Sequence, residues 1–277
     1  MKIIIPTALQ NILKVIKTSF VIWKHALIKT IPFSLIYLII NSLLLAPLDK
    51  LAKIDDKFLD QFSLSLLFSG KYLLIASKIV LSSFVFFVAN ASIIYILNKV
   101  DSNENVSFTQ AIKVGYKKTF LQLLIFILEL VMVGGPILLI LILWGFPNIS
   151  GHFKLATCFV CALAFIPGYI ILVYLMFAIY QLIIEENSII DSIKNSFNLI
   201  SGNWWYMFGV YLICSVVSYL YDLVFDHLFI KDSVYVSFFL KNSFSTILGL
   251  PLLHAFMITI LYNLKTKKRA WLEVGIK

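Results

Sequence analysis

Long apolar segments alternate along the chain with short polar ones. Six of the apolar segments are long enough to cross a bilayer: residues 30–48, 76–98, 120–145, 155–184, 204–225 and 243–264. A membrane-spanning helix needs about 20 mostly apolar residues, and helices are favoured there because they satisfy every backbone polar group internally. The pattern therefore predicts an all-α, polytopic membrane protein with six transmembrane helices, in a single integral membrane domain over residues 1–277.

Composition excludes the alternatives to this interpretation. Hydrophobic residues make up 61% of the 277 positions and charged residues 13%, and the mean hydropathy is +0.95. Soluble domains are about half apolar and about a quarter charged. The chain is therefore not a soluble enzyme, a disordered protein or a small disulfide scaffold. The net charge of +9 comes from side chains scattered at the ends of the apolar segments, so we expect no nucleic-acid partner.

The distribution of positive charge predicts the orientation in the membrane. Fifteen of the 23 Lys and Arg side chains fall before residue 30, within 99–119, within 185–203 or after residue 264. In a six-span arrangement all four regions lie on one side, and an excess of Lys and Arg marks the cytoplasmic side. We therefore expect both termini in the cytoplasm. We also expect the basic tail, residues 265–277, to contact anionic lipid headgroups.

Glycine and proline predict bends in three of the six segments. The third segment contains Gly134-Gly135-Pro136, the fourth contains Pro167-Gly168, and the sixth contains Gly249-Leu250-Pro251. Proline removes a helix hydrogen bond and glycine loosens the helix, so bends are expected at these positions.

A short motif occurs three times along the chain. Val15-Ile16-Lys17-Thr18-Ser19-Phe20 matches Ala111-Ile112-Lys113-Val114-Gly115-Tyr116 and Ser192-Ile193-Lys194-Asn195-Ser196-Phe197. Each copy belongs to a stretch whose apolar residues share one helix face, and each precedes a pair of apolar segments. The motif positions that we single out are Ile16, Lys17, Ser19, Ile112, Lys113, Gly115, Ile193, Lys194 and Ser196.

The repetition predicts three parallel units, each of one amphipathic interfacial helix followed by two spans. Their approximate bounds are residues 1–98, 99–184 and 185–264. Ser107 and Gln110 have the spacing of a capping box, which predicts that the amphipathic helix of the second unit begins at this point.

Three polar residues fall within the predicted spans: Glu129 in the third, His254 in the sixth and Asn90 in the second. Ionisable residues in a membrane are costly and mark functional sites by default. We therefore take Glu129, His254 and Asn90 as a candidate polar site that could line one cavity between units, with Lys78 as a candidate partner of Glu129. Polar groups that hold helices together are the alternative explanation.

Other chemistry is weakly indicated. Asp222, Asp226 and His227 cluster near the end of the fifth segment, but their spacing fixes neither the geometry nor the number of ligands that a metal needs. Cys158 and Cys161 lie in an apolar segment, where a reactive thiolate is disfavoured. No nucleophile elbow, phosphate-binding loop or zinc-protease motif occurs. We expect no metal, no cofactor and no catalytic residues.

The stretch from residue 166 to residue 205 carries a further pattern. Ile166-Pro167-Gly168 begins a span that ends in the acidic turn Glu185-Glu186-Asn187-Ser188, and the third motif and Gly202-Asn203-Trp204-Trp205 follow. This stretch resembles the membrane domain fused to some bacterial glycerophosphoryl diester phosphodiesterases and is similar to related stand-alone bacterial inner-membrane proteins. The resemblance implies a multi-pass protein of the bacterial cytoplasmic membrane. These residues contain no phosphodiesterase domain, so we expect no diesterase activity.

Three functions remain open at this point. The first is a non-enzymatic membrane protein that binds lipid, a partner protein or a second copy of itself and supports envelope function. The second is a transporter or lipid translocator with a polar cavity around Glu129. The third is an intramembrane enzyme in which Glu129 and His254 would be the acid–base pair.

Overall fold

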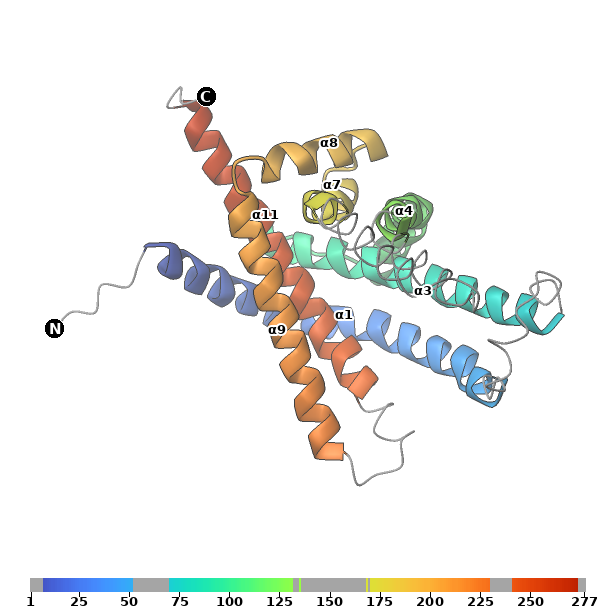
Figure 1. Cartoon of the computed structure of the whole chain (residues 1–277). Coiled ribbons are helices and arrows are strands. Elements are labelled where there is room, and N and C mark those ends of the chain that lie inside the picture. The colour runs from blue at the N-terminus through green and yellow to red at the C-terminus, as the bar shows by residue number, and fades with distance from the viewer. Residues whose placement is uncertain are drawn as a thin grey trace, which may run out of the picture.

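The computed structural model describes residues 7–51, 70–131, 135, 168, 170–229 and 241–273. In this part of the chain every regular element is a helix (Figure 1). The helices are α1 (Thr7–Leu51), α3 (Gly70–Asp101), α4 (Phe108–Glu129), α7 (Ala178–Ile184), α8 (Ile189–Ile200), α9 (Trp204–Phe229) and α11 (Leu250–Glu273), with a π-helical turn, η3 (Ser245–Gly249), directly before α11. The all-α class is therefore confirmed.

Four helical segments are long and apolar enough to cross a membrane. They are Leu13–Ser42, Val80–Asp101, Trp204–Tyr221 and Lys241–Lys268. They correspond to the first, second, fifth and sixth predicted spans. The third and fourth predicted spans fall largely outside the described residues, which include only the beginning of the third and the shorter apolar helix Ile170–Ile184 of the fourth.

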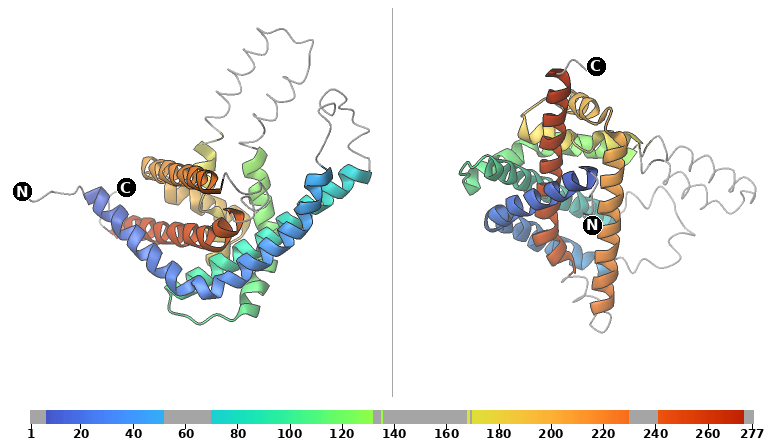
Figure 2. Two further views of the ribbon diagram at one scale, coloured as in Figure 1. Left: turned by 90° about the horizontal axis from the view of Figure 1, so that it is seen from below. Right: turned by 90° about the vertical axis from the view of Figure 1, so that its left-hand side faces the viewer.

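Helix α1 differs from the expected pair of an interfacial helix and a separate span. It is continuous from Thr7 to Leu51, because no glycine, proline or polar turn separates the first motif from the apolar segment. Figure 2 (left) shows that α1 is bent along its length. Pro32, about half-way along the helix, accounts for such a bend because its ring clashes with the carbonyl of residue 28.

In the other two amphipathic stretches, too, the presence or absence of a helix-breaking turn decides whether the stretch is a separate helix. Ser107 and Gln110 form the predicted capping box, in which the Gln110 amide N–H donates to Ser107 Oγ at 3.2 Å and the Ser107 amide N–H donates to Gln110 Oε1 at 3.1 Å. Helix α4 then continues through its motif without a break. Only α8 is a separate short helix, because the turn Ser201-Gly202-Asn203 ends it, with Gly202 at φ 81°. Left-handed backbone of this kind favours glycine.

The predicted irregularity in the sixth segment is present. Residues Ser245–Gly249 form the π-helical turn, and Pro251 follows it without an N–H to donate to the carbonyl four residues earlier. The indole N–H of Trp23 donates to the Leu248 carbonyl at 3.2 Å and so ties α1 to this turn.

Helices α3, α7 and α11 lie at the centre of the described structure. Helix α3 contacts both α7 and α11, α1 and α4 lie against α3, and α8 lies against α7 (Figures 1 and 2). Their shared core is apolar and fully buried, and it includes Ile93, Leu97, Phe177, Ile258 and Leu261. Burial of apolar side chains of this size contributes about 1.5–3 kcal/mol each in water, while between helices in lipid the close packing itself holds them together.

Candidate functional site

His254 and Tyr180 form a buried polar pair between α11 and α7. The Tyr180 hydroxyl lies 2.8 Å from His254 Nδ1, and both side chains are buried. The other ring nitrogen, Nε2, is buried and has no hydrogen-bond partner among the described residues. The pair joins two of the three central helices.

Asn90 belongs to a different cluster, between α3 and α4. Its side-chain N–H donates to Gln122 Oε1 at 3.1 Å, and the Gln122 side-chain N–H donates to the Phe87 carbonyl at 3.1 Å. Gln122 is completely buried. The sequence analysis missed Gln122, although it lies in the third predicted span two turns before Glu129.

Glu129 ends α4 and is partly exposed. In the part of the chain that the structure describes, it has no hydrogen-bond or ion-pair partner, and no ion pair joins it to Lys78. The structure therefore places Asn90 and His254 in separate hydrogen-bonded clusters, with Glu129 two turns beyond the first of them. Neither of the two clefts described below is lined by any of these three residues.

The repeated motif places equivalent positions in equivalent environments. Its fifth position is buried in each copy, as Ser19, Gly115 and Ser196, and its lysines, Lys17, Lys113 and Lys194, are exposed. The second positions, Ile16 and Ile112, are 45% and 37% exposed, while Ile193 is half-buried. In each stretch the face that carries the lysine is exposed, and the face that carries the small residue is buried.

Each small residue lies close to a neighbouring helix. Ser19 Oγ lies 3.1 Å from Thr259 Oγ1 of α11. Ser196 Oγ donates to the Tyr174 carbonyl, in the helix before α7, at 2.6 Å. A Cβ added to Gly115 would lie 2.5 Å from the Val88 carbonyl oxygen of α3.

Three lysines of the basic tail contact the protein itself. Lys265 forms an ion pair with Glu185, Lys267 Nζ donates to Asn203 Oδ1 at 3.3 Å, and Lys268 Nζ donates to the Asn198 carbonyl near the end of α8 at 2.7 Å. These contacts fasten the end of α11 to α8 and to the turns on either side of it.

An apolar cleft of about 240 Å³ lies between α1, α9 and α11. Val15 and Ile16 of α1 and Phe256 of α11 form part of its wall, and the remaining lining residues lie on α9: Trp205, Tyr206, Gly209, Val210 and Ile213. No atom lies within 4 Å of a Cβ added to Gly209, so the cleft is open at this point. This cleft could not be predicted from the amino-acid sequence, since it depends on which helices meet.

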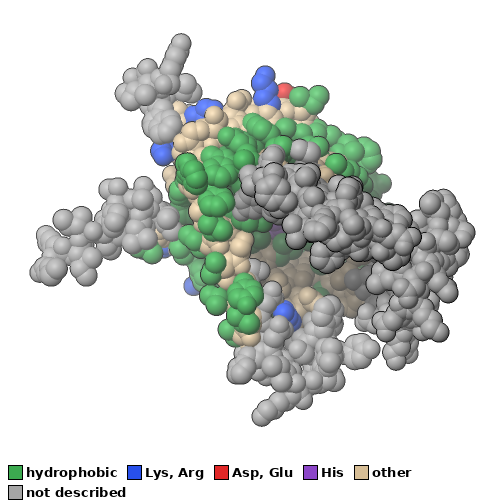
Figure 3. Space-filling view, viewed as in Figure 1, with side chains coloured by type: hydrophobic (Ala, Val, Ile, Leu, Met, Phe, Trp, Pro, Cys, Tyr) green, Lys and Arg blue, Asp and Glu red, His purple; other side chains and the backbone are tan. Residues whose placement is uncertain are grey.

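Helix α9 presents apolar side chains outward beside this cleft (Figure 3). Trp205 is 78% exposed, and a row of exposed aliphatic residues follows it: Leu212, Ile213, Val216, Val217, Leu220, Leu223 and Val224. At the same end of α9, the Tyr206 hydroxyl and the Trp204 indole N–H are buried without a hydrogen-bond partner among the described residues. Large exposed apolar patches mark contact with a membrane or a partner.

Metal-binding geometry is not found among the described residues, where no group of three His, Cys, Asp or Glu side chains is suitably placed. The side chains of Asp222, Asp226 and His227 fall outside the described part of the structure, as do Cys158 and Cys161. Comparison of the chain with protein-family models, curated proteins and solved structures gives no significant match.

Proposed function

We propose that this chain is a non-enzymatic integral membrane protein that binds a membrane lipid in the cleft between α1, α9 and α11 and supports the function of the cell envelope. The observation that carries the proposal is the apolar cleft beside the exposed apolar side chains of α9. The atoms that line an empty cleft lack dispersion contacts on one side, so an empty cleft is less stable than a filled one. In a bilayer, the abundant apolar groups that can fill it are lipid acyl chains.

One polar atom of the lining supports a lipid rather than a purely apolar occupant. The Tyr206 side chain lines the cleft, and its hydroxyl is a buried donor without a partner among the described residues. A buried donor left unpaired costs about 1–3 kcal/mol. The ester oxygens of a phospholipid are acceptors, and they lie next to the acyl chains that would enter the cleft.

For the architecture we infer six spans in three parallel units, with both termini in the cytoplasm of a bacterium and the chain in its cytoplasmic membrane. Support comes from the motif, because its three helices each contact the last helix of the preceding unit: α4 contacts α3, α8 contacts α7, and α1 contacts α11. The last of these contacts closes the series into a ring. The resemblance of residues 166–205 to bacterial inner-membrane proteins supports the location.

The test is native mass spectrometry of the full chain purified in a mild detergent. We expect a stoichiometric lipid on the natural protein and on Gly209→Ala, whose methyl group fits the open space. Gly209→Phe places an aromatic ring in the cleft and should lose the lipid while remaining monodisperse. Retention of the same lipid by Gly209→Phe would contradict the proposal. Bulk lipid alone, or a co-purifying protein or second copy, would instead favour a scaffold that binds a protein partner.

A transporter or lipid translocator is the second candidate, and Glu129 is the observation that favours it. This carboxyl group has no partner among the described residues, so it stabilises no visible contact. Glu129→Gln should therefore leave the protein level and melting temperature unchanged. Loss of a cellular phenotype with an unchanged protein level would support transport through a path at Glu129, and an unchanged phenotype would exclude it.

The basic tail adds a weaker site for lipid headgroups. Lys265, Lys267 and Lys268 gather at the end of α11. Basic residues near a membrane surface contribute about 1 kcal/mol each toward anionic lipid. We propose that this end of the bundle faces anionic headgroups.

A further inference from the structure

A second cleft lies further along α1, where this helix faces the end of α3 and the connection between α3 and α4. Its volume is about 370 Å³, within the range of sites for small ligands. It is lined by four residues of α1, two of the last turn of α3 and three of the connection: Val21, Ile22, His25 and Lys29, then Val100 and Asp101, then Asn103, Glu104 and Asn105.

The walls of this cleft carry opposite charges. The α1 wall carries the ammonium group of Lys29 and the imidazole of His25, whereas Asp101 and Glu104 supply carboxylates on the other wall. Lys29 and Asp101 have no ion-pair partner among the described residues. A cleft whose walls carry opposite charges is electrostatically complementary to a ligand that carries both signs.

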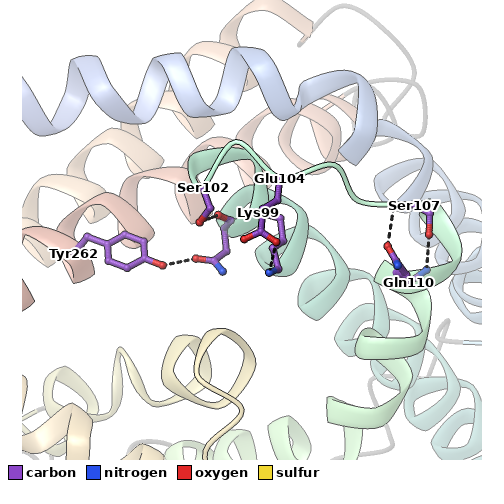
Figure 4. Close-up of polar contacts among 7 residues, drawn as sticks. Lys99, Ser102, Glu104, Ser107, Gln110 and Tyr262 are labelled. Atoms are coloured by element: carbon purple, nitrogen blue, oxygen red, sulfur yellow. Dashed lines mark hydrogen bonds and ion pairs between the residues drawn. The ribbon is translucent and has the colours of Figure 1, made fainter.

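The acidic wall is held in place from within. Glu104 accepts from Lys99 Nζ at 2.7 Å, and Asn103 adopts a left-handed φ of 57° that turns the chain. Asn98, in the last turns of α3, accepts a hydrogen bond from Tyr262 of α11, and the capping box of Ser107 fixes the far end of the connection (Figure 4). The connection is therefore ordered before any ligand binds, which lowers the cost of binding.

The His25 ring is also oriented. Its Nδ1 lies 2.7 Å from the Val21 carbonyl, so this nitrogen carries a hydrogen and donates it. Nε2 is then left for a ligand in the cleft.

The apolar residues of the cleft place it at the boundary between the membrane and water. Val21, Ile22 and Val100 line it together with the charged groups, and they belong to the helices that contain the candidate spans Leu13–Ser42 and Val80–Asp101. A ligand that suits this position has a charged head of both signs and an apolar remainder.

We infer that this cleft binds a phosphoethanolamine group, with the phosphate at Lys29 and the ammonium at Asp101 and Glu104. The group is the headgroup of phosphatidylethanolamine, and this is the source to which we assign it. Because Glu104 is already paired with Lys99, an anionic headgroup without an ammonium leaves the Asp101 carboxylate without a counter-charge, and a lone amine meets Lys29 unfavourably. The inference goes beyond the proposed function, since it assigns a second lipid site that is separate from the apolar cleft.

The test compares phosphatidylethanolamine and phosphatidylglycerol with identical acyl chains, added to the purified full chain and counted by native mass spectrometry. Because the ammonium group would make charge-assisted hydrogen bonds that phosphatidylglycerol cannot make, we expect about a tenfold or greater preference for phosphatidylethanolamine. Asp101→Asn should abolish the preference while leaving phosphatidylglycerol binding unchanged or stronger. Lys29→Gln should weaken the binding of both lipids.

Lys24→Gln is the matched control, since Lys24 is an exposed lysine of α1 that does not line the cleft. Equal binding of the two lipids by the natural protein, or a preference that survives Asp101→Asn, would overturn the inference. If Asp101→Asn cannot be purified, Glu104→Gln tests the same wall. Free phosphoethanolamine is a further probe: failure to displace the lipid supports the membrane source, and displacement at equal concentration overturns it.

The test of the charged cleft can be distinguished from the test of the apolar cleft. Gly209→Phe blocks the apolar cleft and leaves the charged cleft intact. Loss of headgroup preference with a lipid still retained at the apolar cleft refutes only the present inference.

Discussion

Gly115→Ala tests the packing of α4 on α3. Helix propensity alone predicts that this change stabilises the protein by about 1 kcal/mol, because glycine is a poor helix residue. The structure predicts the opposite sign. An added Cβ would lie 2.5 Å from the Val88 carbonyl oxygen and closer still to Ser92 Oγ. Real Cβ atoms do not approach other atoms so closely, so one of the two helices must move.

The cost follows from what holds α3 at this point. Ser92 Oγ lies 2.8 Å from the Val88 carbonyl and 3.0 Å from the Ala111 carbonyl of α4, which is a hydrogen bond between the two helices. Overpacking costs about 1–3 kcal/mol, and loss of the bond between the helices adds about 0.5–1.5 kcal/mol. After the gain in helix propensity, we expect a net loss of about 1–3 kcal/mol, and a melting temperature that is several degrees lower.

The assay is thermal unfolding of the full chain in one detergent, with Gly209→Ala as the control. The control makes the same substitution in a helix where no atom lies within 4 Å of the new Cβ, so it should melt at or slightly above the natural protein. Adding Ser92→Ala to Gly115→Ala removes one obstructing atom and should restore part of the loss. A Gly115→Ala protein that melts as high as the control would refute the packing argument.

Three further predictions concern polar contacts and orientation. Tyr180→Phe leaves both ring nitrogens of buried His254 without a protein partner. It should lower the free energy of unfolding by about 1–3 kcal/mol. The additional change His254→Phe should restore most of this stability, since both side chains are then apolar. Glu185→Lys places two positive charges together at Lys265 and should lower the melting temperature, and the charge-reversed double variant with Lys265→Glu should restore it; no recovery would mean that the ion pair is incidental. Asn103→Cys should react with a membrane-impermeant maleimide only after the cells are permeabilised, and labelling of intact cells would reverse the proposed orientation.

The sequence predicts helices in this protein better than it predicts where they end. Apolar length alone identifies the segments that contain Val80–Asp101, Trp204–Tyr221 and Lys241–Lys268 as candidate spans. The expected boundary between an interfacial helix and the first span is absent, because the amphipathic turns belong to the same helix, α1. Length and hydropathy carry no information on whether two helical stretches are joined, and only a breaker such as Gly202 decides it.

The candidate polar site shows a second limit of sequence reasoning. Asn90 and His254 are both buried and hydrogen-bonded, but to Gln122 and Tyr180 respectively. Polar type and position within a span identify residues that need partners. The choice of partner depends on which helices lie side by side, and this information is absent from a single sequence.

The repeated motif explains how the helices find these neighbours and also where a ligand should be sought. A small residue at its fifth position lets each copy pack closely on a neighbouring helix: Ser19 on α11, Gly115 on α3, and Ser196 at the Tyr174 carbonyl in the helix before α7. Since all three copies use this position for packing, the shared residues account for the fold, and binding is left to features that differ between units. Helix α1 is such a feature: it meets α11 from the opposite end of the chain, and it forms part of the wall of both clefts. A lipid bound in either cleft would therefore stabilise the contact that joins the first unit to the last, and lipid removal should weaken that contact before any other.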